Sequence, residues 1–393
     1  MISDRPAWQM VLLGFGTLSL SALSLKGATS LAWFWLIWTI AFLVGILMGQ
    51  DQKIRAVCLN FGVVTGMLAG AETYFAHIEP PAPVVSDGYY VPDDILGYAP
   101  AKNFRARATK RVGDRLVYDV TYSTDPSGLR ISPPGSSTVD GSLLFFGCSF
   151  TYGEGLPDSE TMPFQVGMLS GKRYRIFNFA FHGYGPHQML AGVESGLVGR
   201  IVNVFPKHAI YSAIPAHVWR AVGKVPFGHH SPRYVLSPDG RITRAGDFTT
   251  RQSFSERSWF EKELRKSAVY RKLENRDPPV TAADLSLYFA IVRRSQELLT
   301  TEYPGLRFDV ILWPDFVPVE RPVYDSMKAE FIKLGIPVHL VTDILPDYNA
   351  NPEKYMIDPA DGHPNALANR ILAEYILSRI ASNHPGVHDR AAH

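Results

Sequence analysis

Three long apolar stretches dominate the N-terminal part of the chain, where charged side chains are rare. They cover about residues 8–25, 31–48 and 56–78. Each is close to the roughly 20 mainly apolar residues that a helix needs to cross the hydrocarbon core of a bilayer. The pattern predicts a membrane anchor over residues 1–79 with about three transmembrane helices. Two helices are the alternative, but dropping the third stretch would leave about twenty apolar residues without a core to join.

Basic residues beside these stretches predict which way the anchor faces. Lys53 and Arg55, in the loop DQKIR, belong in the cytoplasm under the positive-inside rule, and so does Arg5. Three spans then put everything after about residue 79 on the far side of the membrane, whereas two spans would leave it in the cytoplasm. Glu72 lies near the end of the third stretch, where its carboxylate can reach the membrane interface.

The hydrophobic pattern changes to that of strands after the anchor. Residues 80–83 (PPAP) read as a stiff linker, and residues 87–134 are β-rich. Two alternating runs, NFRARATKR and RLVYDVTYS, are separated by Val112-Gly113-Asp114, which predicts a hairpin. We therefore expect a linker and a small β-rich preamble over residues 80–140.

Short apolar runs alternate with helical stretches from Gly141 onward. The apolar runs are residues 143–147, 175–181, 208–214, 308–313 and 337–341. Such nearly continuous runs are typical of strands buried on both faces of a parallel sheet. Helical stretches fall between them at about residues 187–202, 282–301 and 324–334, and another follows residue 365. This alternation predicts a three-layer α/β domain over residues 141–383, followed by a tail at 384–393.

One segment interrupts the alternation. Residues 223–279 read as an insertion into the α/β domain. Within it, Pro238-Asp239-Gly240 predicts a hairpin, because turn residues there separate two β-prone runs. A charged helix is expected to follow at about residues 255–275.

Composition narrows the classes of function. The chain of 393 residues carries 39 Lys and Arg against 37 Asp and Glu, a formal net charge of +2. A balance so near zero gives no electrostatic argument for a nucleic-acid binder, which would need a clustered basic surface, so no nucleic-acid partner is expected. The two cysteines cannot build a disulfide scaffold or a four-thiolate zinc site. These values favour an enzyme or binding protein held at a lipid bilayer.

A serine follows the first predicted strand of the α/β domain. In GCSFTYG, Ser149 lies at the carboxyl end of a strand, where open parallel sheets bind ligands. An exposed serine on such a turn combines a hydroxyl with backbone donors for an oxyanion, as an acyl-transfer nucleophile requires. The alternative is a helix N-cap. Cys148 is a second candidate nucleophile, but adjacent side chains point opposite ways and we expect it to be buried.

An acid and a base occur together near the C-terminus. In DGHPN, His363 precedes a helical run, and Asp361 can accept a hydrogen bond from its Nδ1 and leave Nε2 for a serine hydroxyl. Asp358 is a second candidate partner for this imidazole. Together with Ser149, the pair predicts a catalytic triad at the ends of the sheet; a surface Asp–His loop is the alternative.

These segments resemble sequence blocks of the SGNH/GDSL hydrolase superfamily. GCSFTYG is similar to the first block and DGHPN to the last, which implies Ser149 as nucleophile, His363 as base and Asp361 as acid. NFAFHGYG is similar to the second block, which implies an oxyanion hole formed by the N–H groups of Gly183 and Ser149. The resemblance covers about residues 141–381. It implies a flavodoxin-like three-layer domain with a parallel sheet, ester hydrolysis and no cofactor.

Two positions depart from the family pattern. Ala216 stands where the third block carries an Asn that donates to the oxyanion, and His217 is the candidate to replace it. Cys148 replaces the usual Asp before the nucleophile. The missing Asn is the reason to keep a non-catalytic protein of polysaccharide assembly as an alternative.

Other polar and aromatic side chains near these blocks are candidates to line a substrate site: His182, His187 and Trp313. Neither histidine has a carboxylate or cysteine at ligand spacing, so no metal site is predicted. Glu154 and Asp158 follow the nucleophile turn and are expected to cap the next helix or to face solvent.

A membrane-anchored member of this superfamily is similar to enzymes that add or remove acyl groups on bacterial cell-surface polysaccharides. The resemblance therefore implies a serine esterase or deacylase, multi-pass in the bacterial inner membrane, with its catalytic domain in the periplasm. Its expected substrate is an ester-bearing glycan of the envelope or a small ester. An O-acyltransferase with the same triad is the alternative enzyme.

Overall fold

The computed structural model of the chain consists of two compact units. The first, here named the anchor unit, comprises Met1–Pro80 and Ser255–Asp277. The second, here named the sheet unit, comprises Pro81–Phe254 and Pro278–His393. The residues that the structure describes are 15, 18, 30–48, 51–78, 82–136, 138–250, 267–274, 278–316 and 318–382.

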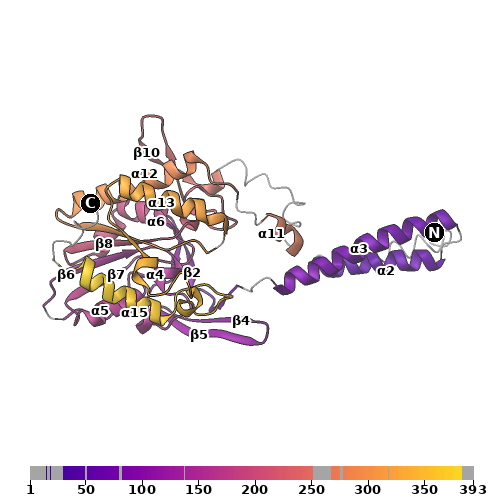
Figure 1. The fold of residues 1–393 in the computed structure, drawn as a ribbon, viewed down its shortest axis with the longest axis horizontal. Helices are drawn as coiled ribbons and strands as arrows, with labels where there is room; N and C mark the ends of the chain where they lie inside the picture. The colour runs from indigo at the N-terminus through magenta and orange to yellow at the C-terminus, as the bar shows by residue number, and fades with distance from the viewer. Residues whose placement is uncertain are drawn as a thin grey trace. The chain divides into compact units, whose positions relative to one another are not determined.

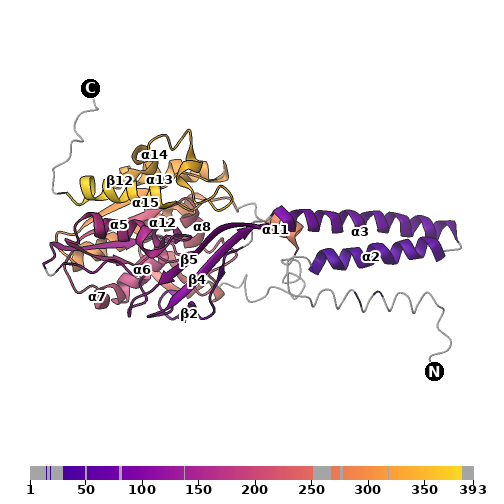
Figure 2. The same cartoon turned by 90° about the horizontal axis from the view of Figure 1, so that it is seen from below.

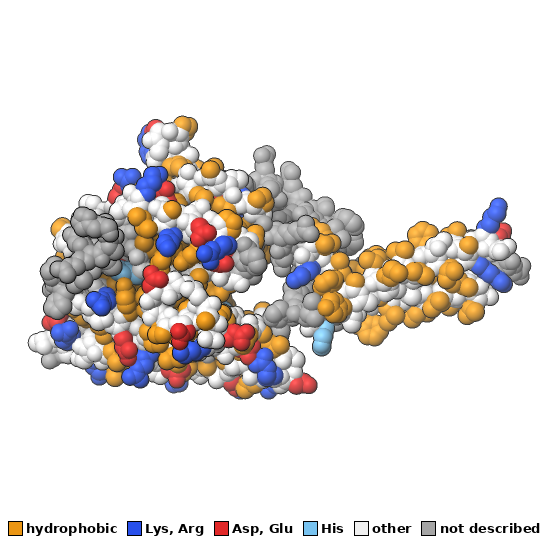
Figure 3. Space-filling model, viewed as in Figure 1, with side chains coloured by type: hydrophobic (Ala, Val, Ile, Leu, Met, Phe, Trp, Pro, Cys, Tyr) orange, Lys and Arg blue, Asp and Glu red, His pale blue; other side chains and the backbone are white. Residues whose placement is uncertain are grey.

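Two long apolar helices, α2 (Ser30–Met48) and α3 (Gln52–Ile78), form the described core of the anchor unit. They lie side by side (Figure 1), and the hydroxyls of Thr39 and Thr65 are hydrogen-bonded between them at 3.0 Å. Figure 3 shows hydrophobic side chains along their outer surface, and Leu43 and Met67 are among the exposed ones. By length and composition, both helices could cross a membrane.

The predicted spans correspond to these helices in part. The second and third stretches form α2 and α3, whereas residues 8–25 lie outside the described residues except for Phe15 and Leu18. Lys53 and Arg55, predicted in a loop, lie instead in the first turn of α3. The helix begins this early because the Asp51 carboxylate accepts a hydrogen bond from the Lys53 N–H at 2.7 Å, as an N-cap does.

A short helix, α11 (Ala268–Glu274), also belongs to the anchor unit and packs on α3. The carboxylate of Glu72 in α3 accepts hydrogen bonds from the Ala268 N–H, at 2.7 Å, and from the Ser267 hydroxyl. Glu72 is only 2% exposed. The rest of the predicted helix at 255–275 lies outside the described residues, and the sequence does not indicate that this segment returns to the anchor.

Five parallel strands form the main sheet of the sheet unit, in the order β12-β11-β8-β6-β7. Their bounds are β6 Gly141–Phe146, β7 Tyr174–Asn178, β8 Pro206–Ala213, β11 Arg307–Leu312 and β12 Val338–Leu340. Numbered along the chain, this order is 2-1-3-4-5, the flavodoxin-like version of the doubly wound fold. The predicted α/β fold class is therefore confirmed.

Helices cover both faces of this sheet (Figure 1). Successive side chains of a strand point to opposite faces. In β6, Leu144 and Phe146 accordingly pack with α6, α12 and α13, whereas Leu143 and Phe145 pack with α5 and α15. These helices are α5 Met162–Leu169, α6 Pro186–Glu194, α12 Ala282–Glu302, α13 Arg321–Lys333 and α15 Ala366–Tyr375.

The predicted helix at 187–202 is wrong as a single element, because α6 ends at Glu194 and α7 (Leu197–Ile201) begins after it. Gly196 separates the two with φ +69°, a left-handed conformation that a continuing helix excludes. The remaining short elements are α4 Ser149–Tyr152, α8 Ala216–Ala221, α14 Val341–Ile344, η1 Asp158–Glu160, η2 Phe248–Thr250, η3 Pro318–Glu320, η4 Pro352–Tyr355 and η5 Ile376–Ile380.

Two small antiparallel sheets precede the main sheet. Their strands are β1 Val84–Val85, β2 Tyr90–Asp93, β3 Gly97–Pro100, β4 Arg105–Val112 and β5 Arg115–Ser123. The hairpin predicted here is present: Val112 pairs with Arg115 across a two-residue turn, and Figure 2 shows β4 and β5 side by side. Tyr89 and Tyr122 of this region pack against Tyr152, after β6, and Phe181, after β7. The preamble thus covers the carboxyl ends of two main strands.

The hairpin predicted around Pro238-Asp239-Gly240 is also present. Its strands are β9 Pro232–Leu236 and β10 Ile242–Asp247, which pair antiparallel. Both belong to the sheet unit, unlike Ser255–Asp277. The segment read as one insertion therefore divides between the two units.

Candidate active site

A sharp turn at the end of β6 carries Ser149, which is buried at 7% exposed and not exposed as the sequence predicted. Gly147 has φ +153°, and a side chain at this position would collide with Thr151, so only glycine fits. Cys148 is then the N-cap of α4, and Ser149 is the first residue of that helix. Ser149 is therefore not an N-cap, which removes the structural alternative considered for it. Cys148 is fully buried among the residues of α5 and α15, as expected from the sequence.

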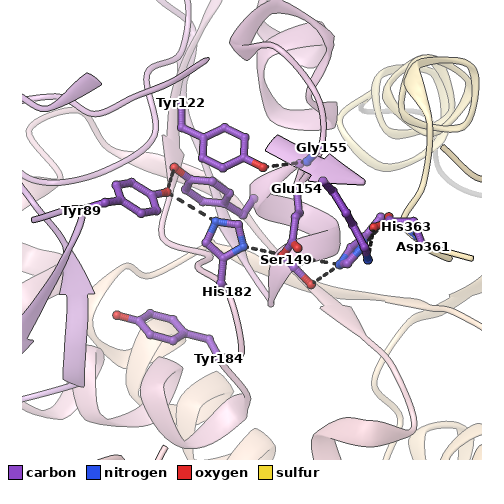
Figure 4. Close-up of polar contacts among 12 residues, drawn as sticks. Tyr89, Tyr122, Ser149, Glu154, Gly155, His182, Tyr184, Asp361 and His363 are labelled. Atoms are coloured by element: carbon purple, nitrogen blue, oxygen red, sulfur yellow. Dashed lines mark hydrogen bonds and ion pairs between the residues drawn. The ribbon is translucent and has the colours of Figure 1, made fainter. Parts of the chain in front are cut away.

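The side chains of Ser149, His363 and Asp361 form one hydrogen-bonded series (Figure 4). The Nε2 atom of His363 is 2.9 Å from the Ser149 Oγ, and its Nδ1 is 2.7 Å from the Asp361 Oδ1. The backbone N–H of His363 donates to the same carboxylate oxygen at 3.1 Å. This second bond fixes the carboxylate against the ring, so Nδ1–H points at Asp361 and Nε2 remains for the serine.

Asp358, the other candidate acid, has different partners. Its carboxylate pairs with the Arg115 guanidinium and accepts the Ala360 N–H at 2.9 Å. Its carbonyl accepts the N–H groups of Asp361 and Gly362, both at 2.9 Å. Asp358 therefore shapes the loop that carries the acid and does not contact the imidazole.

A lysine from the β-rich preamble reaches the Asp361 carboxylate at its other oxygen. The Lys110 Nζ lies 2.7 Å from the Asp361 Oδ2, and the Asp361 side chain has no exposed area. Lys110 shares the buried face of β4 with Ala106 and Ala108. The sequence analysis missed this contact, although a lysine in the inward-facing row of an alternating strand is a signal that could have pointed to it.

Glu154 contradicts its expected role as a cap or a solvated residue. Its carboxylate is buried, with Oε2 2.6 Å from the Nδ1 of His182 and 3.6 Å from the Nε2 of His363. The Nε2 of His182 is 3.4 Å from the Tyr89 hydroxyl, which is hydrogen-bonded to that of Tyr152. Two imidazoles, that of His182 after β7 and that of His363 in the loop before α15, therefore lie at one carboxylate beside the serine (Figure 4).

Opposing effects set the charges of these groups. Burial alone would lower the pKa of His363, but the Glu154 and Asp361 carboxylates outweigh it and raise this pKa above its usual value. Burial would raise the pKa of Glu154, but His363, His182 and Lys110 hold it well below its usual range. Burial would likewise raise the pKa of Asp361, but His363 and Lys110 outweigh this effect, so the pKa of Asp361 is lowered. Both carboxyls are ionised at neutral pH.

A fully buried arginine holds the loop that carries Glu154. The Arg130 guanidinium donates to the carbonyls of Tyr152, Gly153 and Leu156 at 2.6 to 2.8 Å and pairs with Asp158 at 2.9 Å. Asp158 is thus a partner of Arg130 and not the solvent-facing residue expected. These bonds satisfy carbonyls that would otherwise be buried without donors, so the loop has one well-defined conformation.

Aromatic side chains pack against the ring of His363. The ring of Phe150 lies with its centroid 5.3 Å from that of His363 and 5.1 Å from that of Trp313. Trp313 is 3% exposed, and its Nε1 donates to the Ser212 Oγ at 3.0 Å. Trp313 therefore lies in the core and supports the site from there, which is the alternative to the lining position that the sequence left open for it.

The proposed oxyanion donors have contrasting surroundings. Gly183 has φ +73°, and a side chain there would meet the Tyr98 hydroxyl, which donates to the His182 carbonyl at 2.8 Å. Within the described ranges, neither the Gly183 N–H nor the Ser149 N–H has a hydrogen-bond acceptor. His217 is fully buried, and its Nδ1 contacts the Tyr211 hydroxyl at 2.7 Å. It therefore has a partner in the core and no described contact with Ser149.

His187 lies apart from the hydrogen-bonded series. It is 2% exposed, and burial together with the nearby Arg220 lowers its pKa to about 3, so the ring is neutral. Its Nδ1 has no partner among the described residues. In the described part of the chain, no group of three or more His, Cys, Asp or Glu side chains is arranged to hold a metal ion.

Comparison with known proteins gives fold-level likenesses only. No known family and no curated protein matches the sequence. Similar solved structures include a Desulfitobacterium hafniense protein assigned to the G-D-S-L family of lipolytic proteins, with 10% identity, 60% of this chain and 96% of that chain covered, and a TM-score of 0.34. Esterase EstA from Pseudoalteromonas sp. has 13% identity, with 62% of this chain and 97% of that chain covered and a TM-score of 0.32. A carbohydrate acetylesterase family member from Sinorhizobium meliloti has 11% identity, with 60% of this chain and 94% of that chain covered and a TM-score of 0.30.

Identities and scores this low transfer no function to the chain. The class of protein has to be inferred from the order of the strands and from the contacts at the carboxyl edge of the sheet.

Proposed function

We propose that the sheet unit is a serine ester hydrolase of the SGNH/GDSL type, in which Ser149, His363 and Asp361 are the nucleophile, base and acid. The observation that carries this proposal is the hydrogen-bonded series of these three side chains at the carboxyl edge of a flavodoxin-like sheet. This edge is where open α/β sheets bind ligands. Ser149 comes from one part of the sequence and the pair Asp361 and His363 from another, and their side chains meet there in the order that acyl transfer requires.

In the proposed reaction, the Ser149 Oγ attacks the ester carbonyl carbon while its proton passes to the Nε2 of neutral His363. The carbonyl π electrons move to oxygen, and the N–H groups of Ser149 and Gly183 stabilise that oxyanion. The tetrahedral intermediate then collapses, and the bond between its carbon and the alcohol oxygen breaks. The alcohol leaves with the proton from Nε2. A water molecule then attacks the acyl-enzyme in the same way, releasing the carboxylic acid and restoring Ser149.

The missing third donor has a defined consequence in this mechanism. Loss of one oxyanion donor typically slows catalysis by about 100- to 1000-fold. Ala216 has no side-chain donor, and His217 is fully buried with its Nδ1 at the Tyr211 hydroxyl, its Nε2 without a partner among the described residues and no described contact with Ser149. We therefore expect a slow esterase, in which two backbone N–H groups carry the stabilisation of the oxyanion.

An ester-bearing glycan of the cell envelope is the substrate class that we propose. Two half-exposed aromatic rings lie near the loop that holds His182 and Gly183. Tyr90 is 47% exposed with its ring centroid 6.0 Å from that of His182, and the ring of Phe227, 44% exposed, lies next to Gly183. Aromatic surfaces beside a few polar groups are typical of ligand sites, and they suit the apolar faces of sugar rings.

The test of the proposed function uses the full chain purified in detergent with an activated short-chain ester. Burst release followed by slower turnover, and a serine-directed phosphonate that adds covalent mass to Ser149, are expected. Addition of a glycan acceptor distinguishes hydrolysis from O-acyl transfer, because transfer yields an acylated glycan. A folded protein with neither burst nor labelling would contradict the proposal and favour a non-catalytic role in polysaccharide assembly.

We further propose that the chain spans the bacterial inner membrane three times, with the sheet unit in the periplasm. The apolar lengths of α2 and α3 and the basic residues Lys53 and Arg55 at the start of α3 support this orientation. Protease added to spheroplasts is expected to digest the sheet unit, detected through a C-terminal tag. Digestion only after the membrane is permeabilised would indicate a cytoplasmic sheet unit and two spans.

A further inference from the structure

A second carboxylate faces the proposed base from the side of the nucleophile. The Glu154 Oε2 is 3.6 Å from the Nε2 of His363, the atom that also contacts the Ser149 Oγ. The side chain of Glu154 is 11% exposed, so little water screens its charge. A Ser-His-Asp mechanism does not require an acidic group at this position. An ionised carboxylate buried beside the reacting atoms therefore calls for its own explanation.

The backbone fixes this carboxylate relative to the serine. The Glu154 N–H donates to the Ser149 carbonyl at 2.9 Å. Glu154 also lies between two glycines with left-handed backbone, Gly153 at φ +84° and Gly155 at φ +78°. The Gly155 N–H donates to the Tyr122 hydroxyl at 2.8 Å. The loop conformation therefore directs the side chain into the site and away from solvent.

His182 holds the carboxylate in place. Its Nδ1–H donates to the Glu154 Oε2 at 2.6 Å, and its Nε2 is 3.4 Å from the Tyr89 hydroxyl. The Tyr98 hydroxyl fixes the backbone of His182 through its carbonyl at 2.8 Å. Since His182 follows β7 and Glu154 follows β6, this bond joins two strand ends across the site.

We propose that Glu154 is a second electrostatic partner of the His363 imidazolium and that His182 is the positioning residue for it. This inference rests on the proposed function. Before reaction, the neutral Nε2 accepts the serine proton and gains little from Glu154. Once the proton has moved, Nε2 carries hydrogen and positive charge 3.6 Å from a carboxylate. An interaction that strengthens only as charge develops lowers the barrier to acylation.

The same charge has an opposite effect at low pH. Protonated His363 can donate Nε2–H to Glu154, which leaves the Ser149 hydroxyl without a base. Activity therefore rises with pH as His363 loses its proton, and Glu154 moves that rise to higher pH. Of the other charged groups at the site, Asp361 acts in the same direction and Lys110 in the opposite one. Tyrosines that face Glu154 remain neutral, because burial raises the pKa of each: Tyr90, Tyr118, Tyr122 and Tyr152.

The test compares Glu154→Gln with the wild type in the full chain in detergent. Two readouts are followed against pH: the rate of phosphonate labelling at Ser149, and the titration of His363 by NMR of ring-labelled histidine, assigned by its loss in His363→Gln. In Glu154→Gln, the midpoint of the His363 titration and the acid limb of labelling, which is the rise of the labelling rate with pH, are both expected to move to lower pH by about 1 unit. This is the lower end of the effect of a nearby opposite charge. The labelling rate on the plateau is expected to fall about 10-fold, the equivalent of that change.

Two further variants separate charge from packing. Glu154→Asp retains the carboxylate, so its acid limb is expected to lie at a pH close to that of the wild type and above that of Glu154→Gln. Glu160→Gln, six residues along the same segment, removes a carboxylate with no described contact to His363 and is expected to change neither readout. His182→Asn is expected to lower the acid limb less than Glu154→Gln, and to add nothing in the double variant, because His182 acts through Glu154.

The outcomes distinguish this inference from the proposed function. Absence of labelling in a wild type whose His363 midpoint still falls in Glu154→Gln would overturn the esterase and leave the electrostatic pairing. An unchanged midpoint and acid limb in a folded Glu154→Gln protein would overturn the pairing and leave the esterase. If Glu154→Gln does not fold, an unchanged acid limb in His182→Asn overturns the pairing.

Discussion

Replacing Ser149 by alanine is expected to reduce turnover of an activated ester by about 10⁴- to 10⁶-fold, as removal of the nucleophile does in a well-studied serine protease. The hydroxyl lies 2.9 Å from the His363 Nε2, and the described part of the site holds no other nucleophile in contact with that atom. The variant is also expected to lose covalent labelling by the phosphonate. Steady-state turnover and the intact mass of the labelled protein measure both effects.

Cys148→Ala is the matched control for this prediction, because Cys148 is the other nucleophilic side chain on the same turn. Its side chain is fully buried among the residues that pack with α5 and α15. We expect Cys148→Ala to keep labelling at Ser149 and most of its turnover, with some loss of stability from the small cavity. Loss of activity in Cys148→Ala with retention in Ser149→Ala would make the thiol the nucleophile.

The sheet could be predicted from the sequence because both of its faces are covered. Strands buried on both sides consist of almost uninterrupted apolar residues, and all five such runs are strands of the main sheet. Helix boundaries are harder to predict from the sequence, because Gly196 interrupts a segment whose hydrophobic period continues on both sides. The packing of α11 on α3 includes the cap that Glu72 gives to α11, a contact across almost 200 positions that no local pattern encodes.

The site divides in the same way. Ser149, Asp361 and His363 lie in short segments with a recognisable local arrangement, so the sequence alone indicates them as candidates. Lys110 and Glu154 depend on which elements the fold brings together: a preamble strand against the C-terminal loop, and a loop between two glycines turned inward. Electrostatic partners of this kind are set by tertiary packing. A search for isolated charged residues on inward-facing positions would be needed to find them.

Replacing Asp361 by asparagine is expected to lower turnover by about 10⁴-fold, the effect that the equivalent change has in a serine protease triad. Asp361 accepts hydrogen bonds from both the Nδ1 and the backbone N–H of His363. An asparagine that presents its NH₂ group to Nδ1 favours the tautomer with hydrogen on Nε2, which can no longer accept the serine proton. Lys110 also loses its carboxylate partner, so its charge opposes the imidazolium without compensation. Turnover of the activated ester measures the effect.

Asp358→Asn is the control, because it changes a neighbouring carboxylate of the same loop to the same amide. The Asp358 carboxylate pairs with Arg115 and accepts a hydrogen bond from the Ala360 N–H. The amide oxygen of asparagine can still accept the bond from Ala360. Its activity is therefore expected to stay close to that of the wild type. Equal loss in both variants would mean that the shape of the loop, and not a carboxylate at Nδ1, supports His363. Loss in Asp358→Asn alone would transfer the acid's role to Asp358, through a rearrangement of the loop that brings it to the imidazole.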